Sequence, residues 1–96
     1  ELGNRSAEAR QKLNALFDTW RAMVEAFFVE ARDRFPEGTD FKALSTFVLT
    51  TMEGGIMLAR ANQDVRQFDR AVKQLRNYLE LMQIGTKVVS RKRRRE

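Results

Sequence analysis

The chain has 96 residues, enough for about one small domain with one hydrophobic core. Apolar residues make up 43% and charged residues 32%, as in globular proteins, and no apolar run approaches the roughly 18 residues of a membrane span. The sequence contains neither cysteine nor histidine, which excludes disulfides, a cysteine nucleophile, and metal or triad chemistry based on histidine. We therefore expect no metal and no cofactor.

The positive charge is concentrated in one short segment. Residues 91–96 carry five positive charges and one negative charge, so they hold +4 of the formal net charge of +5. Residues 1–90 hold 13 Lys/Arg against 12 Asp/Glu, which is a net charge of +1. The sequence starts at Glu1 without a signal-peptide pattern, which indicates an excised or processed piece of a cytoplasmic protein.

The first predicted helix covers about residues 6–34, with Asn4 or Ser6 as its N-cap. Its apolar residues recur at steps of three and four, which places them on one stripe of a helix with 3.6 residues per turn. They are Leu13, Leu16, Phe17, Trp20, Met23, Val24, Phe27, Ala31 and Phe35. The only proline, Pro36, lies in a cluster of helix breakers at residues 35–40 that ends this helix.

The second predicted helix covers about residues 40–62, with Thr39 or Asp40 as its N-cap. One apolar stripe consists of Phe41, Leu44, Val48, Met52, Gly55, Ile56 and Ala59, and a neighbouring one of Phe47, Thr51, Gly54 and Leu58. The apolar arc is thus wider than packing on a single neighbour requires, so this helix should contact more than one partner. Each glycine within it costs about 0.8 to 1 kcal/mol relative to alanine. Because the apolar pattern continues in phase, we favour a close helix crossing at Gly54 and Gly55 over a kink or a helix end.

The third predicted helix covers about residues 64–84, with Asp64 and Gln67 spaced as a capping box and Gly85 as its C-terminal stop. Its apolar residues follow the a/d pattern of a bundle seam: Val65, Phe68, Val72, Leu75, Leu79 and Met82. Only a short turn at Asn62 and Gln63 connects it to the preceding helix, which predicts an antiparallel hairpin. The fold class is therefore all-α, with three main antiparallel helices and a basic, disordered tail at residues 86–96.

Residues 44–79 resemble the last two helices of the TetR/AcrR family of bacterial transcriptional repressors. The pair Glu53-Gly54, followed by an aliphatic run and Ala59-Arg60, looks like that family's penultimate helix. The stretch Leu16-Phe-Asp-Thr-Trp20 is similar to the helix before it, so the resemblance covers about residues 13–83. Those proteins are longer and begin with a helix-turn-helix DNA-binding domain that this sequence lacks.

The resemblance implies that residues 1–85 form a C-terminal regulatory and dimerisation domain of a repressor. Its expected partners are a second copy of the chain, an unknown small-molecule effector and, only through an N-terminal domain absent from this chain, operator DNA; no membrane is expected. In such a domain the last two helices of each protomer form a four-helix bundle with their copies. The implied dimer-interface residues are Phe47, Thr51, Gly54, Gly55, Leu58, Phe68, Val72, Leu75 and Leu79. The implied ligand-pocket residues are Phe17, Trp20, Val24, Phe27, Val48 and Met52.

Three alternatives remain beside this interpretation. Aromatic residues at helical spacing are often plain core rather than pocket lining. The carboxylate pairs Glu25/Glu30 and Asp64/Asp69 lie on polar faces without histidine or metal-ligand company, so we predict no catalytic residue and no enzyme. The rival hypothesis is a small helical interaction module whose tail binds nucleic acid or an acidic partner. The residues of that tail are Arg91, Lys92, Arg93, Arg94 and Arg95. Because no aromatic residues are interleaved with them, we favour a solvated, disordered segment over one that binds phosphates.

Overall fold

The computed structural model describes residues 2–95, with the side chains of residues 5–83, 85 and 92. The described part is built of three helices, α1 (Leu2–Glu30), α2 (Phe41–Asn62) and α3 (Arg66–Arg95). A single 3₁₀ turn, η1 (Arg32–Arg34), follows α1, and no strand occurs among the described residues. The prediction of an all-helical fold with three main helices is confirmed.

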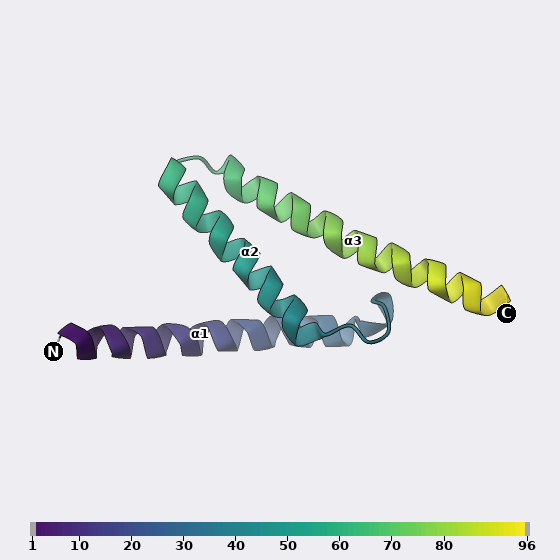
Figure 1. Cartoon of the computed structure of the whole chain (residues 1–96), viewed down its shortest axis with the longest axis horizontal. Coiled ribbons are helices and arrows are strands. Elements are labelled where there is room, and N and C mark those ends of the chain that lie inside the picture. Colours follow the sequence, from purple (N-terminus) through teal and green to yellow (C-terminus); the bar gives the residue numbers. More distant parts are fainter. Residues whose placement is uncertain (1, 96) are drawn as a thin grey trace.

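The three helices form an open, elongated arrangement rather than a closed bundle. Helix α2 packs against both α1 and α3, and η1 contacts α3 (Figure 1). The molecule measures 66 × 29 × 15 Å and has a radius of gyration of 17.7 Å. A compact domain of this length would have a radius of gyration of about 12.5 Å. The fold therefore leaves much of its helical surface without an intramolecular neighbour.

The core is correspondingly small. Among the described hydrophobic side chains only Phe35, Leu44 and Leu75 are buried, each 8% exposed or less, and Ser45 is a fully buried polar residue. The accessible surface is 8101 Å². A compact monomer of 11.2 kDa would expose about 5,700 Å². An excess of about 2,400 Å² is thus open to solvent.

Three aromatic rings close the turn between α1 and α2. Phe28, Phe35 and Phe41 lie with ring centroids 5.5 to 6.4 Å apart. The chain leaves the helix here because a residue before proline disfavours helical dihedral angles, and Phe35 before Pro36 is extended. Buried aromatic contacts of this kind fix the angle at which the chain returns as α2.

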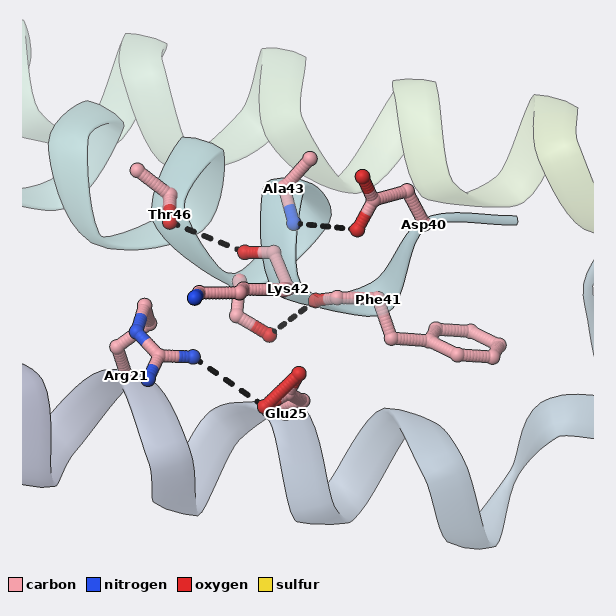
Figure 2. A network of polar contacts seen from close by, with 8 residues as sticks. Arg21, Glu25, Asp40, Phe41, Lys42, Ala43 and Thr46 are labelled. Atoms are coloured by element: carbon pink, nitrogen blue, oxygen red, sulfur yellow. Dashed lines mark hydrogen bonds and ion pairs between the residues drawn. The ribbon is translucent and has the colours of Figure 1, made fainter.

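The cap predicted for α2 is confirmed at Asp40. Its carboxylate accepts a hydrogen bond from the Ala43 N–H at 3.0 Å, which satisfies one of the free backbone donors of the first turn (Figure 2). The other candidate, Thr39, instead donates its hydroxyl proton to the Pro36 carbonyl at 2.6 Å.

The predicted antiparallel hairpin of α2 and α3 is present, but its capping differs from the expectation. Gln63 takes the left-handed conformation, with φ of 49°, and the Asp64 N–H donates to the Ala59 carbonyl at 2.9 Å. The Asp64 carboxylate accepts from the backbone N–H of Arg66 at 3.0 Å, and Gln67 donates its N–H to the Asp64 carbonyl. Asp64 therefore caps α3 without the reciprocal side-chain bond of a capping box.

Several predicted helix ends are wrong. Helix α1 begins at Leu2, so Asn4 and Ser6 lie inside it, and it ends at Glu30 rather than near residue 34. Helix α3 passes through Gly85 to Arg95, so Gly85 does not stop it and the backbone of residues 86–95 is helical rather than disordered. The helix continues through this position because a single glycine destabilises a helix by only about 1 kcal/mol. Lysine and arginine also stabilise the last turns of a helix, where the helix dipole is negative.

Candidate functional site

An open pocket of about 970 Å³ lies between α1 and α2. Small-molecule sites typically enclose about 300 to 1,000 Å³. The α1 wall consists of Leu13, Phe17, Asp18 and Arg21, and the α2 wall of Lys42, Thr46, Leu49, Thr50, Glu53, Gly54 and Met57. The pocket thus spans two helices and combines apolar, hydroxyl and charged groups.

Helix α2 carries two small residues in the part that faces its neighbours, of which Gly54 belongs to the pocket wall. Ser45 is fully buried on α2, and its hydroxyl donates to the Phe41 carbonyl at 2.6 Å, so it occupies little space between the helices. Farther along α2, a Cβ added at Gly54 would meet nothing within 4 Å, which leaves that part of the wall open.

The charged groups of the pocket are unequally paired. The Arg21 guanidinium forms an ion pair with Glu25 at 3.2 Å on α1, and Lys42 lies on the facing side of α2 (Figure 2). Lys42 and the half-buried Glu53 form no ion pair with any described residue. Asp18, on the α1 wall, likewise forms no ion pair with a described residue, so the pocket offers one cation and two carboxylates that can contact a ligand.

Few of the predicted pocket residues line this space. Phe17 does, and Trp20 touches the Phe17 ring edge-on with centroids 5.6 Å apart. Phe27 is 71% exposed and Met52 37% exposed, whereas Val24 and Val48 are half-buried, and none of the four lines this pocket.

On α1, the apolar residues predicted to share one stripe divide between a half-buried face and an exposed face. Its half-buried residues are Phe17, Arg21, Val24, Glu25 and Phe28. Its exposed stripe contains Leu13, Leu16, Trp20, Met23 and Phe27. The two stripes lie roughly 100° apart around the helix, and periodicity shows both without indicating which one meets α2.

The predicted dimer-interface residues separate into two groups. Gly55 and Leu75 are buried, and Phe68, Val72 and Leu79 are half-buried within the single chain. Phe47 and Leu58 are instead 45% and 54% exposed. Gly55 and Leu75 thus belong to the core of one protomer. The α2 stripe of Phe47, Thr51, Gly54 and Leu58 is exposed at Phe47 and Leu58 and half-buried at Thr51 and Gly54.

The close helix crossing predicted at the glycine pair exists at Gly55, between α2 and α3 of the same chain. A Cβ at Gly55 would lie 3.2 Å from Cδ2 of Phe68 and 3.4 Å from Cβ of Ala71. Gly54 instead borders the pocket between α1 and α2. The two neighbouring glycines therefore serve different surfaces.

Sequence patterns missed most of the pocket lining. Leu49, Glu53 and Met57 follow one another at steps of four along α2, but a mixed set of apolar and acidic residues gives no amphipathic signal. Ser45 was missed because a serine inside a helix carries no sign of complete burial. The spacing of residues 46, 49, 50, 53 and 57 on one helical face is the only signal that points to this wall.

The structure bears only in part on the predictions about nucleic acid, metal and membrane binding. Of the predicted nucleic-acid tail, the Lys92 side chain is exposed, and the side chains of Arg91, Arg93, Arg94 and Arg95 lie outside the described part. Within that part, no three acidic residues are grouped so that they could hold a metal ion. None of the helices, as far as they are described, combines the length and apolar character that crossing a membrane requires.

An all-helical domain with a ligand-sized pocket on one side of α2 and an exposed apolar stripe on another has the construction of a regulatory domain. The family described as Transcriptional regulator LmrA/YxaF-like, C-terminal domain, matches residues 1–74. The chain belongs to this family of TetR-regulator C-terminal domains, which confirms the resemblance. No curated protein and no solved structure shows significant similarity to it. The match includes every residue of the pocket and stops within α3.

Proposed function

We propose that this chain is the effector-sensing and dimerisation domain of a TetR-like transcriptional repressor. The observation that carries the proposal is the position of α2, which forms one wall of the pocket and also presents the exposed stripe. The family match supports a regulatory domain rather than the rival interaction module. In this proposal, operator DNA is bound through an N-terminal domain absent from this chain, and the protein acts in the cytoplasm.

The dimer proposed here covers the α2 stripe with a second copy of α2 and α3, as a four-helix bundle. Two observations support it. Phe47 touches Tyr78 edge-on, with centroids 5.5 Å apart, so the stripe continues from α2 onto α3. The excess exposed surface of about 2,400 Å² exceeds the roughly 800 Å² that each partner buries in a standard interface.

The proposed mechanism is mechanical. A ligand between α1 and α2 contacts both helices and favours one separation of them, and α2 transmits that separation to the dimer interface. The ligand shifts the equilibrium only by the difference between its affinities for the two arrangements, typically about 1 to 3 kcal/mol.

Filling the pocket tests the ligand site. Thr50→Trp places a large side chain in the α2 wall, so the fluorescent probe anilinonaphthalene sulfonate should bind at least about tenfold more weakly than to the parent, which is about 1.4 kcal/mol. Thr19→Trp is the matched control, because Thr19 is exposed on α1 outside the pocket. Equal probe affinity of the parent and Thr50→Trp would show that the pocket is not the binding site.

A further inference from the structure

The pocket between α1 and α2 has two ends of different chemical character. The two helices run in opposite directions, and Figure 1 shows α2 leaving α1 at an angle, so the pocket widens along α2. At the narrow end, Lys42 of α2 lies across from Arg21 of α1 (Figure 2). Because the helices are antiparallel, Leu13 of α1 belongs to the wide end, with Glu53 and Met57 of α2. The wide end therefore combines apolar side chains with a carboxylate.

Glu53 is the carboxylate at the wide end. It is half-buried and forms no ion pair with a described residue. Leu49 and Met57 lie about one helical turn before and after it, and both line the pocket beside it. Apolar neighbours withhold water from a carboxylate, and a positive charge that arrives with a ligand offsets that loss. Glu53 is thus placed to attract a cation.

The cations of the protein that line the pocket do not neutralise Glu53. Lys42 precedes Glu53 by 11 residues, which corresponds to about 16 Å along the axis of α2. Salt screens most of an interaction over that distance, because the Debye length is about 8 Å at physiological ionic strength. Arg21 is already paired with Glu25 at 3.2 Å. The charge of Glu53 therefore remains available to a ligand.

An anionic ligand would find weaker anchors in the same pocket. Lys42 is exposed to solvent, and contacts between solvent-exposed charges contribute little to affinity. The Arg21 guanidinium would have to share its charge with Glu25. The unpaired charge that is best shielded from water in this pocket is therefore negative and belongs to Glu53, since Asp18 is exposed.

The surroundings of Glu53 suit an apolar ligand body. Leu13 is 50% exposed and Met57 is 70% exposed, so a ligand that covers them removes apolar surface from water. The half-buried ring of Phe17 also lines the pocket, and the face of an aromatic ring attracts a cation.

We propose that the effector of this pocket is a hydrophobic organic cation, in which an aromatic or aliphatic body carries an amine or quaternary ammonium group whose charge lies beside Glu53. This assignment rests on the proposed effector site and specifies the chemical class of its ligand. The apolar body covers Leu13 and Met57, and the carboxylate selects the sign of the charge.

Tetraphenylphosphonium and tetraphenylborate test the sign of the charge, because the two ions have nearly the same size and shape. Calorimetric titration of the 96-residue chain should give a Kd for the phosphonium about tenfold lower than for the borate. Glu53→Gln should raise the Kd of the phosphonium at least about fivefold, and it should leave the Kd of the borate unchanged or lower. Circular dichroism checks that the variant keeps its helices.

Glu30→Gln is the matched control, because Glu30 is exposed on α1 outside the pocket. It removes the same charge and should keep both Kd values within about twofold of the parent. Equal losses of phosphonium affinity in Glu53→Gln and Glu30→Gln would overturn the assignment, because net charge alone would then explain binding. Absence of phosphonium binding by the parent would also overturn it.

Thr50→Trp separates a wrong ligand class from a wrong site. If this variant weakens the binding of both ions, the effector site stands. The cation assignment is then wrong if the borate binds the parent as tightly as the phosphonium, or if Glu53→Gln leaves the Kd of the phosphonium unchanged. If Thr50→Trp weakens the binding of neither ion, the pocket is not the binding site, and both proposals fail.

Discussion

At the scale of single residues, Gly54 and Gly55 are chemically identical neighbours in different environments. Gly55 is buried against Phe68, whereas a Cβ at Gly54 would meet open space. Gly55 therefore permits the close approach of α2 to α3, whereas Gly54 only lowers the stability of the helix because glycine has a low helix propensity. The expectation that the Gly55 crossing joins two protomers is corrected here, because its partner helix belongs to the same chain.

Substitutions at the two glycines should shift thermal stability in opposite directions. Gly55→Leu overpacks the α2–α3 crossing and should destabilise the fold by about 1 to 3 kcal/mol. Gly54→Ala should stabilise it by up to about 1 kcal/mol, because alanine favours the helix and meets nothing. Thermal unfolding followed by circular dichroism measures both. If Gly55→Leu melts at or above the temperature of the parent, the close approach is wrong.

Asp64 makes stability depend on pH at the start of α3. The guanidinium and backbone N–H of Arg66 both donate to its carboxylate and hold the pKa of Asp64 below its ordinary value of 3.8. Because the pKa is lower in the folded state, the stabilisation is present above pH 3.8 and is lost as the pH falls through the lowered pKa.

Asp64→Asn should therefore melt below the parent at neutral pH, and the difference should disappear in acid below the lowered pKa. Asparagine keeps an oxygen that accepts the N-cap hydrogen bond, so the remaining difference reports the charge. Asp18→Asn is the control, since Asp18 forms no ion pair with a described residue. A difference between parent and Asp64→Asn that is the same at every pH would contradict this account.

At the scale of elements, the contact of α2 with its neighbours depends on a small buried side chain. Ser45 is fully buried, and its hydroxyl donates to the Phe41 carbonyl of its own helix. The serine hydroxyl thus needs no hydrogen-bond partner from another helix. We infer that the position is occupied by serine because a larger side chain would not fit the tightly packed space around it.

Enlarging this position should disturb the packing of α2. Ser45→Leu should cost about 1 to 3 kcal/mol, whereas Ser45→Ala should change the free energy of unfolding by less than about 1 kcal/mol. Thr46→Leu is the control, because Thr46 is exposed and its hydroxyl makes the same kind of bond, to the Lys42 carbonyl. Denaturant titration measures all three, and equal losses at positions 45 and 46 would contradict the steric argument.

At the scale of the whole molecule, the protomer exposes about 2,400 Å² more surface than a compact monomer of its mass would. Exposed stripes run along α1 and α2, and the buried core contains few side chains. Association that covers the α2 stripe would supply the burial that one chain lacks, so the stability of the dimer should depend on protein concentration.

The melting temperature should therefore rise with concentration, and light scattering should give twice the 11.2 kDa of the chain. Leu58→Asp, in the α2 stripe, should yield monomers and remove the concentration dependence. Met23→Asp introduces the same charge at a comparably exposed position on α1 and should leave the dimer intact. A parent that is monomeric, or equal effects of both variants, would rule out the proposed interface.

The sequence by itself determined the three helices and the turns between them, and its resemblance to the TetR/AcrR family gave the class of domain. The helices and turns follow from local physics: apolar residues at steps of three and four, Pro36 with its neighbours, and the carboxylate of Asp40 as a cap. The end of α3 was missed because glycine at position 85 suits a helix stop and is also tolerated inside a helix.

Only the tertiary structure decided which helical faces meet. It assigned Gly55 to the contact with α3, left Phe27 exposed, and formed a pocket wall from residues of mixed polarity such as Glu53. The physical reason is that periodicity places a residue on a face of its own helix, whereas the neighbour of that face depends on the crossing of helices. The Phe28–Phe35–Phe41 cluster closes the turn between α1 and α2, and Gly55 permits the close approach of α2 to α3.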